Sequence, residues 1–111
     1  PYPFPLLEEL TAGAPPDGKL VYVVRCDDGF RGPVKVGIAH DVAFRVRKMQ
    51  VSNPYPLRLL GTLPGGRVVE RRIHEHLASY RLRGEWFDLD MNALAWLVTL
   101  FVMSRSQEEA A

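Results

Sequence analysis

The chain contains three runs of apolar residues whose pattern is typical of β-strands. Leu20–Arg25 is rich in β-branched and aromatic residues and is apolar on both faces, which predicts a central strand. Val34–Ala39 alternates along its length and predicts a hairpin partner for the first strand. Leu57–Leu63 predicts a third strand. Together these runs predict a small, three-stranded, mostly antiparallel sheet.

A helix is predicted on each side of the third strand along the chain. The first begins at the N-cap Asp41 and ends before Asn53–Pro56, because residues that precede proline leave the α region. The second runs from the Pro64–Gly66 turn to about Tyr80, and Gly84 is its stop signal. Apolar positions three or four residues apart give each helix a buried stripe. The stripes are Val42, Val46 and Met49 in the first helix, and Val69, Ile73, Leu77 and Tyr80 in the second.

The two ends of the chain differ from the segment between them. Residues 1–18 contain five prolines and predict an irregular leader, with one helical turn within Leu6–Leu10. Residues 105–111 are expected to form a C-terminal tail. We therefore place the folded domain at residues 19–104. Its order of strands and helices predicts an α+β fold in which helices flank the sheet.

The last predicted helix is the most apolar part of the chain. It follows a short extended segment, Glu85–Leu89, is capped by Asp90 and runs from Met91 to about Ser104. Its apolar stretch, Ala93–Met103, is about half the roughly 20 residues that a membrane span requires, so no membrane association is expected. Packing against the core is the favoured interpretation of this helix. The alternative is a contact surface for a second copy of the chain or for a flanking domain.

Composition limits the class of protein. A length of 111 residues with 47% hydrophobic and 24% charged residues is typical of one globular domain. Cys26 is the only cysteine, which excludes an internal disulfide and a cysteine-based zinc site and favours a reducing, cytoplasmic setting. The first residues lack the basic and apolar pattern of a signal peptide.

Positive charge is concentrated in the middle of the chain. The whole sequence has a net charge of only +1, whereas the segment from Asp41 to Glu85 has nine basic residues against four acidic ones. Basic residues in such a segment attract a nucleic-acid backbone independently of base sequence. The alternative is that they form a solvated helix surface. The candidate contacts are Arg47, Lys48, Arg58, Arg71, Arg72, Arg81 and Arg83.

Four short motifs stand in order along the predicted strands and helices. They are Val21-Tyr22, Lys35-Val36-Gly37, Arg45 eight residues after that glycine, and Glu70 on the second long helix. This order resembles the GIY-YIG nuclease superfamily over about Lys19–Leu89. The run Glu70-x-x-x-His74, followed by Gly84-Glu85-Trp86-Phe87, is similar to a compact, often phage-associated branch of that superfamily. The resemblance implies a metal-dependent endonuclease that hydrolyses DNA phosphodiester bonds.

Glu70 is the candidate metal ligand. A phosphodiester hydrolase needs a cation, a group that activates water and donors to the phosphate oxygens. A carboxylate is a hard oxygen ligand suited to Mg²⁺, which takes only one or two carboxylates from a protein, and Mn²⁺ is the alternative ion. The structural alternative for Glu70 is a helical pair with His74 or a solvated carboxylate. Asp27 and Asp28 form a rival acidic pair that we expect to shape a turn.

The resemblance implies that the Tyr22 hydroxyl acts as general base or positions the attacking water. A free tyrosine titrates near 10, so a basic role requires nearby positive charge, and Lys35 on the adjacent strand could supply it. Lys35 also departs from the family pattern, which usually has tyrosine at that place. The structural alternative for Tyr22 is a half-buried core residue with a hydrogen-bonded hydroxyl.

Three further side chains complete the candidate site. Arg45 could bind a phosphate bidentately, or it is simply an exposed helix arginine. His40 assists proton transfer, binds phosphate or has no role, and His74 supports Glu70 or transfers a proton. Two rival classes of function stay open: a non-catalytic DNA-binding module with the same fold, and a protein-interaction domain that uses the last helix and Trp96.

Overall fold

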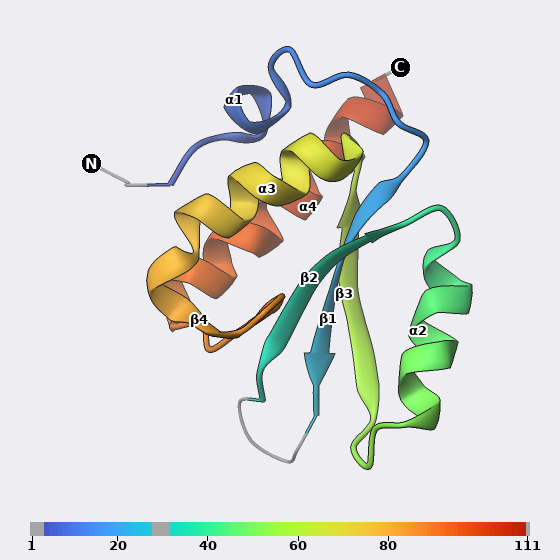
Figure 1. The fold of residues 1–111 in the computed structure, drawn as a ribbon. Helices are drawn as coiled ribbons and strands as arrows, with labels where there is room; N and C mark the ends of the chain where they lie inside the picture. Colours follow the sequence, from blue (N-terminus) through green and yellow to red (C-terminus); the bar gives the residue numbers. More distant parts are fainter. Residues whose placement is uncertain (1–3, 28–31, 111) are drawn as a thin grey trace.

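Strand β1 (Leu20–Cys26) is paired along both of its edges and organises the sheet (Figure 1). In this computed structural model, which describes residues 4–27 and 32–110, β2 (Val34–Ala39) and β3 (Leu57–Leu63) run antiparallel to β1 on its two sides. These strands confirm the three runs predicted from the sequence. Asp28, predicted to shape the β1–β2 turn, lies outside the described residues.

The sheet has five strands, not the three that the sequence predicts. β4 (Arg81–Arg83) and β5 (Trp86–Phe87) form a hairpin, and β5 pairs with β2, which gives the antiparallel order β3-β1-β2-β5-β4. β4 is only three residues long and all of them are exposed, so its Arg-Leu-Arg sequence is too short to identify a strand. Gly84, with φ of 54°, belongs to the hairpin turn and is not the stop signal of the preceding helix.

Helix boundaries follow the capping residues. α2 (Val42–Val51) begins after Asp41, whose Oδ1 accepts a hydrogen bond of 3.0 Å from the backbone N–H of Phe44, as predicted. α3 (Gly66–His76) ends one turn earlier than expected. A separate 3₁₀ turn, η1 (Ala78–Tyr80), carries the chain from α3 into β4.

The last helix is longer than predicted. α4 (Met91–Ala110) starts at the expected cap, where Asp90 Oδ1 accepts a hydrogen bond of 2.8 Å from Ala93 N–H. It continues past Ser104, because the residues that follow contain no glycine or proline to stop it. Residues 105–110, expected to be a tail, are therefore helical, and they form the red end of the ribbon in Figure 1.

The first described residues pack onto the domain. α1 (Leu7–Thr11) confirms the predicted helical turn, and its Leu7 and Leu10 are buried in the same core as α3 and α4. Trp96 is also buried, stacks on Phe4 with ring centroids 4.8 Å apart, and donates a hydrogen bond of 2.7 Å to the Pro5 carbonyl. Trp96 is thus a core residue, so the prediction that it contacts a protein partner is wrong.

Helix α4 divides its apolar residues between the core and solvent. Ala93, Leu97 and Leu100 are buried, which confirms the predicted core packing. Val98 and Val102 are exposed, so contact with a second copy or a flanking domain through this helix stays a prediction. Across the described ranges 4–27 and 32–110, no helix combines the length and apolar character that crossing a membrane requires.

Alternation along β1 creates a core on each face of the sheet. Val21 and Val23 belong to the larger core with α1, α3 and α4, whereas Tyr22 and Val24 belong to a smaller core beneath α2. Figure 1 shows α2 on one side of the sheet and α3 and α4 on the other. The α+β class is therefore confirmed, and Tyr22 is placed between the sheet and α2.

Candidate active site

The floor of the candidate site is made by a cross-strand pair. Tyr22 on β1 lies opposite Gly37 on β2, and its ring crosses the position where any larger side chain would stand. A Cβ atom at residue 37 would lie 2.6 Å from the Tyr22 hydroxyl oxygen. Glycine is therefore required beside this tyrosine, which gives the Tyr-and-Gly motif a steric cause.

A polar hollow of about 320 Å³ opens beside this floor, and we call it the Glu70 hollow. β1 and β2 supply its floor, α2 and α3 supply two walls, and the β4–β5 turn supplies Glu85. It contains two carboxylates, a tyrosine and four cationic side chains. The lining residues are Lys19, Tyr22, Lys35, Ile38, Arg45, Arg67, Glu70 and Glu85.

Glu70 is the least satisfied side chain of this hollow. Its Oε2 is buried and has no hydrogen-bond partner among the described residues. Burial raises the pKa of Glu70 to about 7, and the neighbouring Glu85 carboxyl group acts in the same direction. Arg67 and Lys35 oppose this rise. The two carboxyl groups are therefore close neighbours, although they come from α3 and the β4–β5 turn.

The Tyr22 hydroxyl is held in its protonated form. Burial, together with the negative charges of Glu85 and Glu70, raises the pKa of Tyr22 to about 12, and the charge of Arg45 opposes this rise. The side chain is only 2% exposed, and its hydroxyl lies 3.9 Å from the sulfur of Met49. At neutral pH such a hydroxyl is a hydrogen-bond donor and not a base.

Lys35 forms an ion pair with a carboxylate. Its Nζ lies 3.7 Å from Glu85 Oε1 and 5.9 Å from the centre of the Trp86 ring. Arg45 is the cation that lowers the pKa of Tyr22, so stabilisation of a Tyr22 phenolate by Lys35 stays a prediction. Lys35 itself neutralises one member of the carboxylate pair.

The two candidate histidines lie outside the Glu70 hollow. His74 shares α3 with Glu70, but its Nε2 donates a hydrogen bond of 2.8 Å to the Val36 carbonyl, and its ring packs against Phe87. His74 thereby fastens α3 to β2 beneath the site. His40 Nδ1 donates a hydrogen bond of 3.0 Å to the Gly18 carbonyl.

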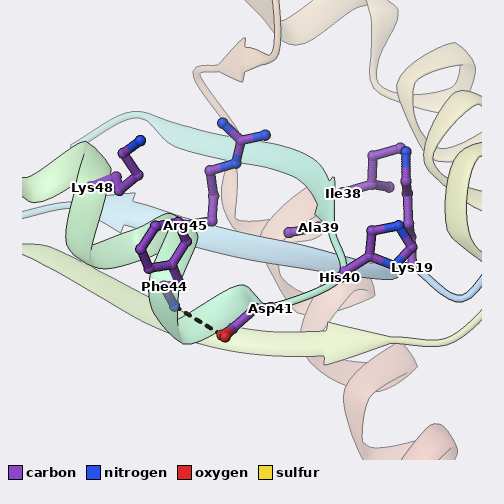
Figure 2. Close-up of a pocket in the computed structure, with 8 residues that line it drawn as sticks. All are labelled: Lys19, Ile38, Ala39, His40, Asp41, Phe44, Arg45 and Lys48. Atoms are coloured by element: carbon purple, nitrogen blue, oxygen red, sulfur yellow. Dashed lines mark hydrogen bonds between the residues drawn. The ribbon is translucent and has the colours of Figure 1, made fainter.

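A second hollow of about 430 Å³ adjoins the first, and we call it the Phe44 hollow (Figure 2). The two hollows share Lys19, Ile38 and Arg45. His40 belongs to this second hollow. Its full lining is Lys19, Ile38, Ala39, His40, Asp41, Phe44, Arg45 and Lys48.

The structure separates the seven basic residues proposed to contact a nucleic acid. Arg47 and Lys48 flank the Phe44 ring. Arg58 pairs with Asp27 at 2.9 Å, and Arg72 donates to the carbonyls of Leu10 and Ala12. Arg81 lies over the Phe87 ring, and Arg71 and Arg83 are exposed. Of the seven, Lys48 lines one of the two hollows.

Sequence reasoning missed three charged residues that line the Glu70 hollow. Lys19 precedes β1, Arg67 stands in the first turn of α3, and Glu85 follows the turn glycine of the β4–β5 hairpin. Glu85 was recognised only as part of the Gly84–Phe87 motif. That motif is the sequence feature that could have identified Glu85 as a site residue. The hairpin that brings Glu85 to Glu70 is hard to predict, because its first strand, β4, is fully exposed.

The Glu70 hollow suits a divalent cation that takes few ligands from the protein. Within residues 4–27 and 32–110, no three histidine, cysteine, aspartate or glutamate side chains gather closely enough to hold a metal ion. A cation here would therefore take one or two carboxylates and complete its coordination with water, which Mg²⁺ commonly does. The buried, unpartnered oxygen of Glu70 is the position such an ion would satisfy.

Residues 19–101 match the sequence model of a protein family described as the T5orf172 domain. No curated protein and no solved structure matches the chain significantly. The matched range runs from the residue before β1 to the middle of α4 and contains every residue of the Glu70 hollow.

Proposed function

This chain belongs to the T5orf172 domain family, and we propose that it is a DNA endonuclease that hydrolyses phosphodiester bonds with a divalent cation at Glu70. This family is phage-associated and is often linked to a nuclease-like, GIY-YIG-like fold. The motifs that resemble GIY-YIG nucleases also converge in space: Tyr22 crosses Gly37, and both Arg45 and Glu70 line the hollow beside them.

The unpartnered oxygen of Glu70 carries the proposal. Buried polar atoms in proteins almost always have a hydrogen-bond partner, so Glu70 Oε2 needs a reason to be without one. The nearby Glu85 carboxylate makes it more costly for Glu70 to be ionised when no cation is bound, and it makes cation binding at Glu70 more favourable. Glu70 would hold Mg²⁺ or Mn²⁺, and the negative charge of Glu85 beside it would add to the attraction. When bound, such a cation neutralises charge that develops on the phosphate and lowers the pKa of a coordinated water.

Cationic side chains around the carboxylates are suited to bind the phosphate. Arg45 on α2 and Arg67 on α3 line two walls of the hollow. Lys19, immediately before β1, lines it as well. Guanidinium groups donate two parallel hydrogen bonds to phosphate oxygens, which fixes orientation as well as charge. We assign Arg45 and Arg67 to the non-bridging oxygens of the scissile phosphate.

Glu85 is the side chain best suited to accept the proton of the attacking water. With Glu70 on the cation, the other polar side chains of the hollow are cations or the Tyr22 hydroxyl. Burial keeps Tyr22 protonated, because it raises the pKa of that hydroxyl to about 12. We therefore revise the sequence-based hypothesis. The Tyr22 hydroxyl, which here donates to the weak acceptor Met49 Sδ at 3.9 Å, would donate to the water or phosphate when substrate is bound. Lys35 holds Glu85 in place at 3.7 Å.

Plasmid nicking tests the proposed function. Wild type should convert supercoiled DNA to the open circle with Mg²⁺ or Mn²⁺ and not with EDTA, and Glu70→Gln should lose at least 100-fold in rate, about the loss expected when one transition-state interaction is removed. Arg45→Ala should also be strongly impaired. Glu75→Gln is the matched control, since Glu75 is exposed on the same helix and outside the hollow.

A different result would assign the chain to another class. If wild type binds DNA with a strong salt dependence but never nicks it, the endonuclease proposal is wrong and the non-catalytic DNA-binding module is correct. Equal nicking by wild type and Glu70→Gln would place the activity elsewhere or in a contaminant.

A further inference from the structure

We propose that the Phe44 hollow binds an unpaired nucleotide of the DNA, with its base stacked on the Phe44 ring, next to the phosphate held in the Glu70 hollow. This inference deepens the proposed endonuclease function and relies on it for the position of the scissile phosphate. It names the substrate class as DNA that is single-stranded, or opened, beside the cleavage site.

The Phe44 ring is available for stacking. It is 50% exposed, although phenylalanine is among the residue types most often buried. α2 packs on the sheet through Val42 and Val46, so the core does not require this ring. An exposed aromatic face in a hollow is the surface on which single-strand-binding proteins stack bases.

Cations stand over the Phe44 ring and around the hollow. Lys48 Nζ lies over the ring, 5.4 Å from its centre, Arg47 lies over it at 6.0 Å, and Arg45 and Lys48 rise from α2 beside Phe44 (Figure 2). Arg47 and Lys48 are exposed side chains, which a stacked base would displace toward its own phosphates. Lys19 and His40 stand together at the other end of the hollow (Figure 2). The one carboxylate of the lining, Asp41, uses Oδ1 to cap α2. An exposed aromatic ring among cationic side chains combines the two elements of sequence-independent single-strand binding.

The two hollows form one path for a DNA strand. Lys19, Ile38 and Arg45 line both of them, so a strand whose phosphate contacts Arg45 enters the Phe44 hollow with its next nucleotide. A base inside a duplex is already stacked and paired, and offers no free face to the ring. The arrangement therefore favours a strand whose base beside the scissile phosphate is unstacked.

Equilibrium binding in EDTA tests this subsite without relying on cleavage. Fluorescence anisotropy of the full chain would compare a short single-stranded DNA with the duplex of the same sequence. Phe44→Leu keeps the bulk of the side chain and removes the aromatic face. It should weaken single-strand binding about tenfold, the size expected for one lost stacking contact, and change duplex binding less than about twofold. Phe44→Trp should retain wild-type affinity.

Tyr55→Leu is the matched control. Tyr55 is 49% exposed, as Phe44 is, but lies outside both hollows, so its substitution should leave both affinities unchanged. Near-identical thermal unfolding of the variants would show that the exposed substitutions leave the fold intact.

Several outcomes overturn the subsite. It is wrong if Phe44→Leu has no effect on single-strand binding, if it weakens duplex binding equally, or if Tyr55→Leu reproduces it. Tenfold tighter binding of RNA than of DNA of the same sequence would overturn the assignment to DNA. The two proposals fail separately. If nicking depends on Glu70 but Phe44→Leu leaves single-strand binding unchanged, only the subsite is wrong. If single-strand binding depends on Phe44 but wild type does not nick DNA, only the endonuclease proposal is wrong.

Discussion

At the scale of single residues, packing explains motif positions whose meaning the sequence leaves open. Gly37 is required because the Tyr22 ring occupies the space of its missing side chain. The Tyr22 side chain is 2% exposed, and this burial is the largest cause that raises its pKa to about 12. The glycine of β2 thus leaves room for a buried, protonated tyrosine on β1.

Gly37→Ala should destabilise the protein by about 1–3 kcal/mol, the usual cost of forcing an added group into a packed core. The new Cβ would lie 2.6 Å from the Tyr22 hydroxyl oxygen, so the ring must move. Urea denaturation followed by circular dichroism measures the cost. In a Tyr22→Leu background the same substitution should cost much less, because the obstructing ring is gone. An unchanged cost in that background would show that the strain lies elsewhere.

Glu70 should make stability depend on pH in a predictable direction. Its folded-state pKa is raised to about 7 from the usual 4.5, so the folded protein keeps a proton that the unfolded chain releases. The free energy of unfolding that protonated Glu70 contributes is fully present below about pH 4.5 and is lost as pH rises through about 7. In EDTA, Glu70→Gln should therefore be as stable as wild type near pH 4.5 and more stable than wild type above pH 7. The expected gain is about 1–2 kcal/mol after allowance for solvent screening.

Thermal unfolding of the two proteins across this pH range provides the measurement. Glu75→Gln, an exposed change on the same helix, should show no comparable pH-dependent gain. A Glu70→Gln advantage that is constant with pH, or that grows toward acid, would contradict the raised pKa.

At the scale of elements, capping residues and periodic apolar stripes were predictable, and pairing between exposed segments was not. β1, β2, β3 and the caps Asp41 and Asp90 were identified because each has a local signature. β4 is not predictable because it has only three residues, all of them exposed, and because its pairing with β5 depends on the tertiary fold. That omission also hid Glu85 from the candidate site, since only the hairpin turns it toward Glu70.

Asp90→Ala should destabilise the protein by about 1–2 kcal/mol, through loss of a helix cap and a side-chain hydrogen bond. Asp90 Oδ1 caps α4 at Ala93, and Oδ2 accepts a hydrogen bond of 3.0 Å from the Tyr80 hydroxyl. Urea denaturation gives the change in unfolding free energy. Asp90→Asn retains an acceptor for the cap and should cost less. If both substitutions were neutral, the cap would not contribute to stability.

At the scale of the whole molecule, segments far apart in the chain complete each other. The segment expected to be an irregular leader contributes Leu7 and Leu10 to the core of the domain, and Pro5 accepts a hydrogen bond from the Trp96 indole. Arg72, expected to contact nucleic acid, instead binds the carbonyls of Leu10 and Ala12. The prolines of this segment are visible in the sequence, but the surface of α3 and α4 against which the segment packs is not.

Leu10→Ala should destabilise the protein by about 2–4 kcal/mol, as for other buried leucines, although it lies outside the domain boundary predicted from sequence. Leu10 is fully buried, whereas Leu6 of the same segment is exposed. Leu6→Ala is therefore the control and should change stability by less than about 0.5 kcal/mol. Equal effects of the two substitutions in urea denaturation would mean that α1 does not pack on the core in solution.

Cation binding at Glu70 is the central claim for the whole molecule, and electron paramagnetic resonance of Mn²⁺ tests it most directly. Titrating wild type and Glu75→Gln with Mn²⁺ should remove one ion per chain from the free-ion signal, and adding Mg²⁺ should restore it. Glu70→Gln should lose that binding, because its side chain no longer offers the buried anionic oxygen. Undiminished Mn²⁺ binding by Glu70→Gln would contradict the assignment of Glu70 as the metal ligand.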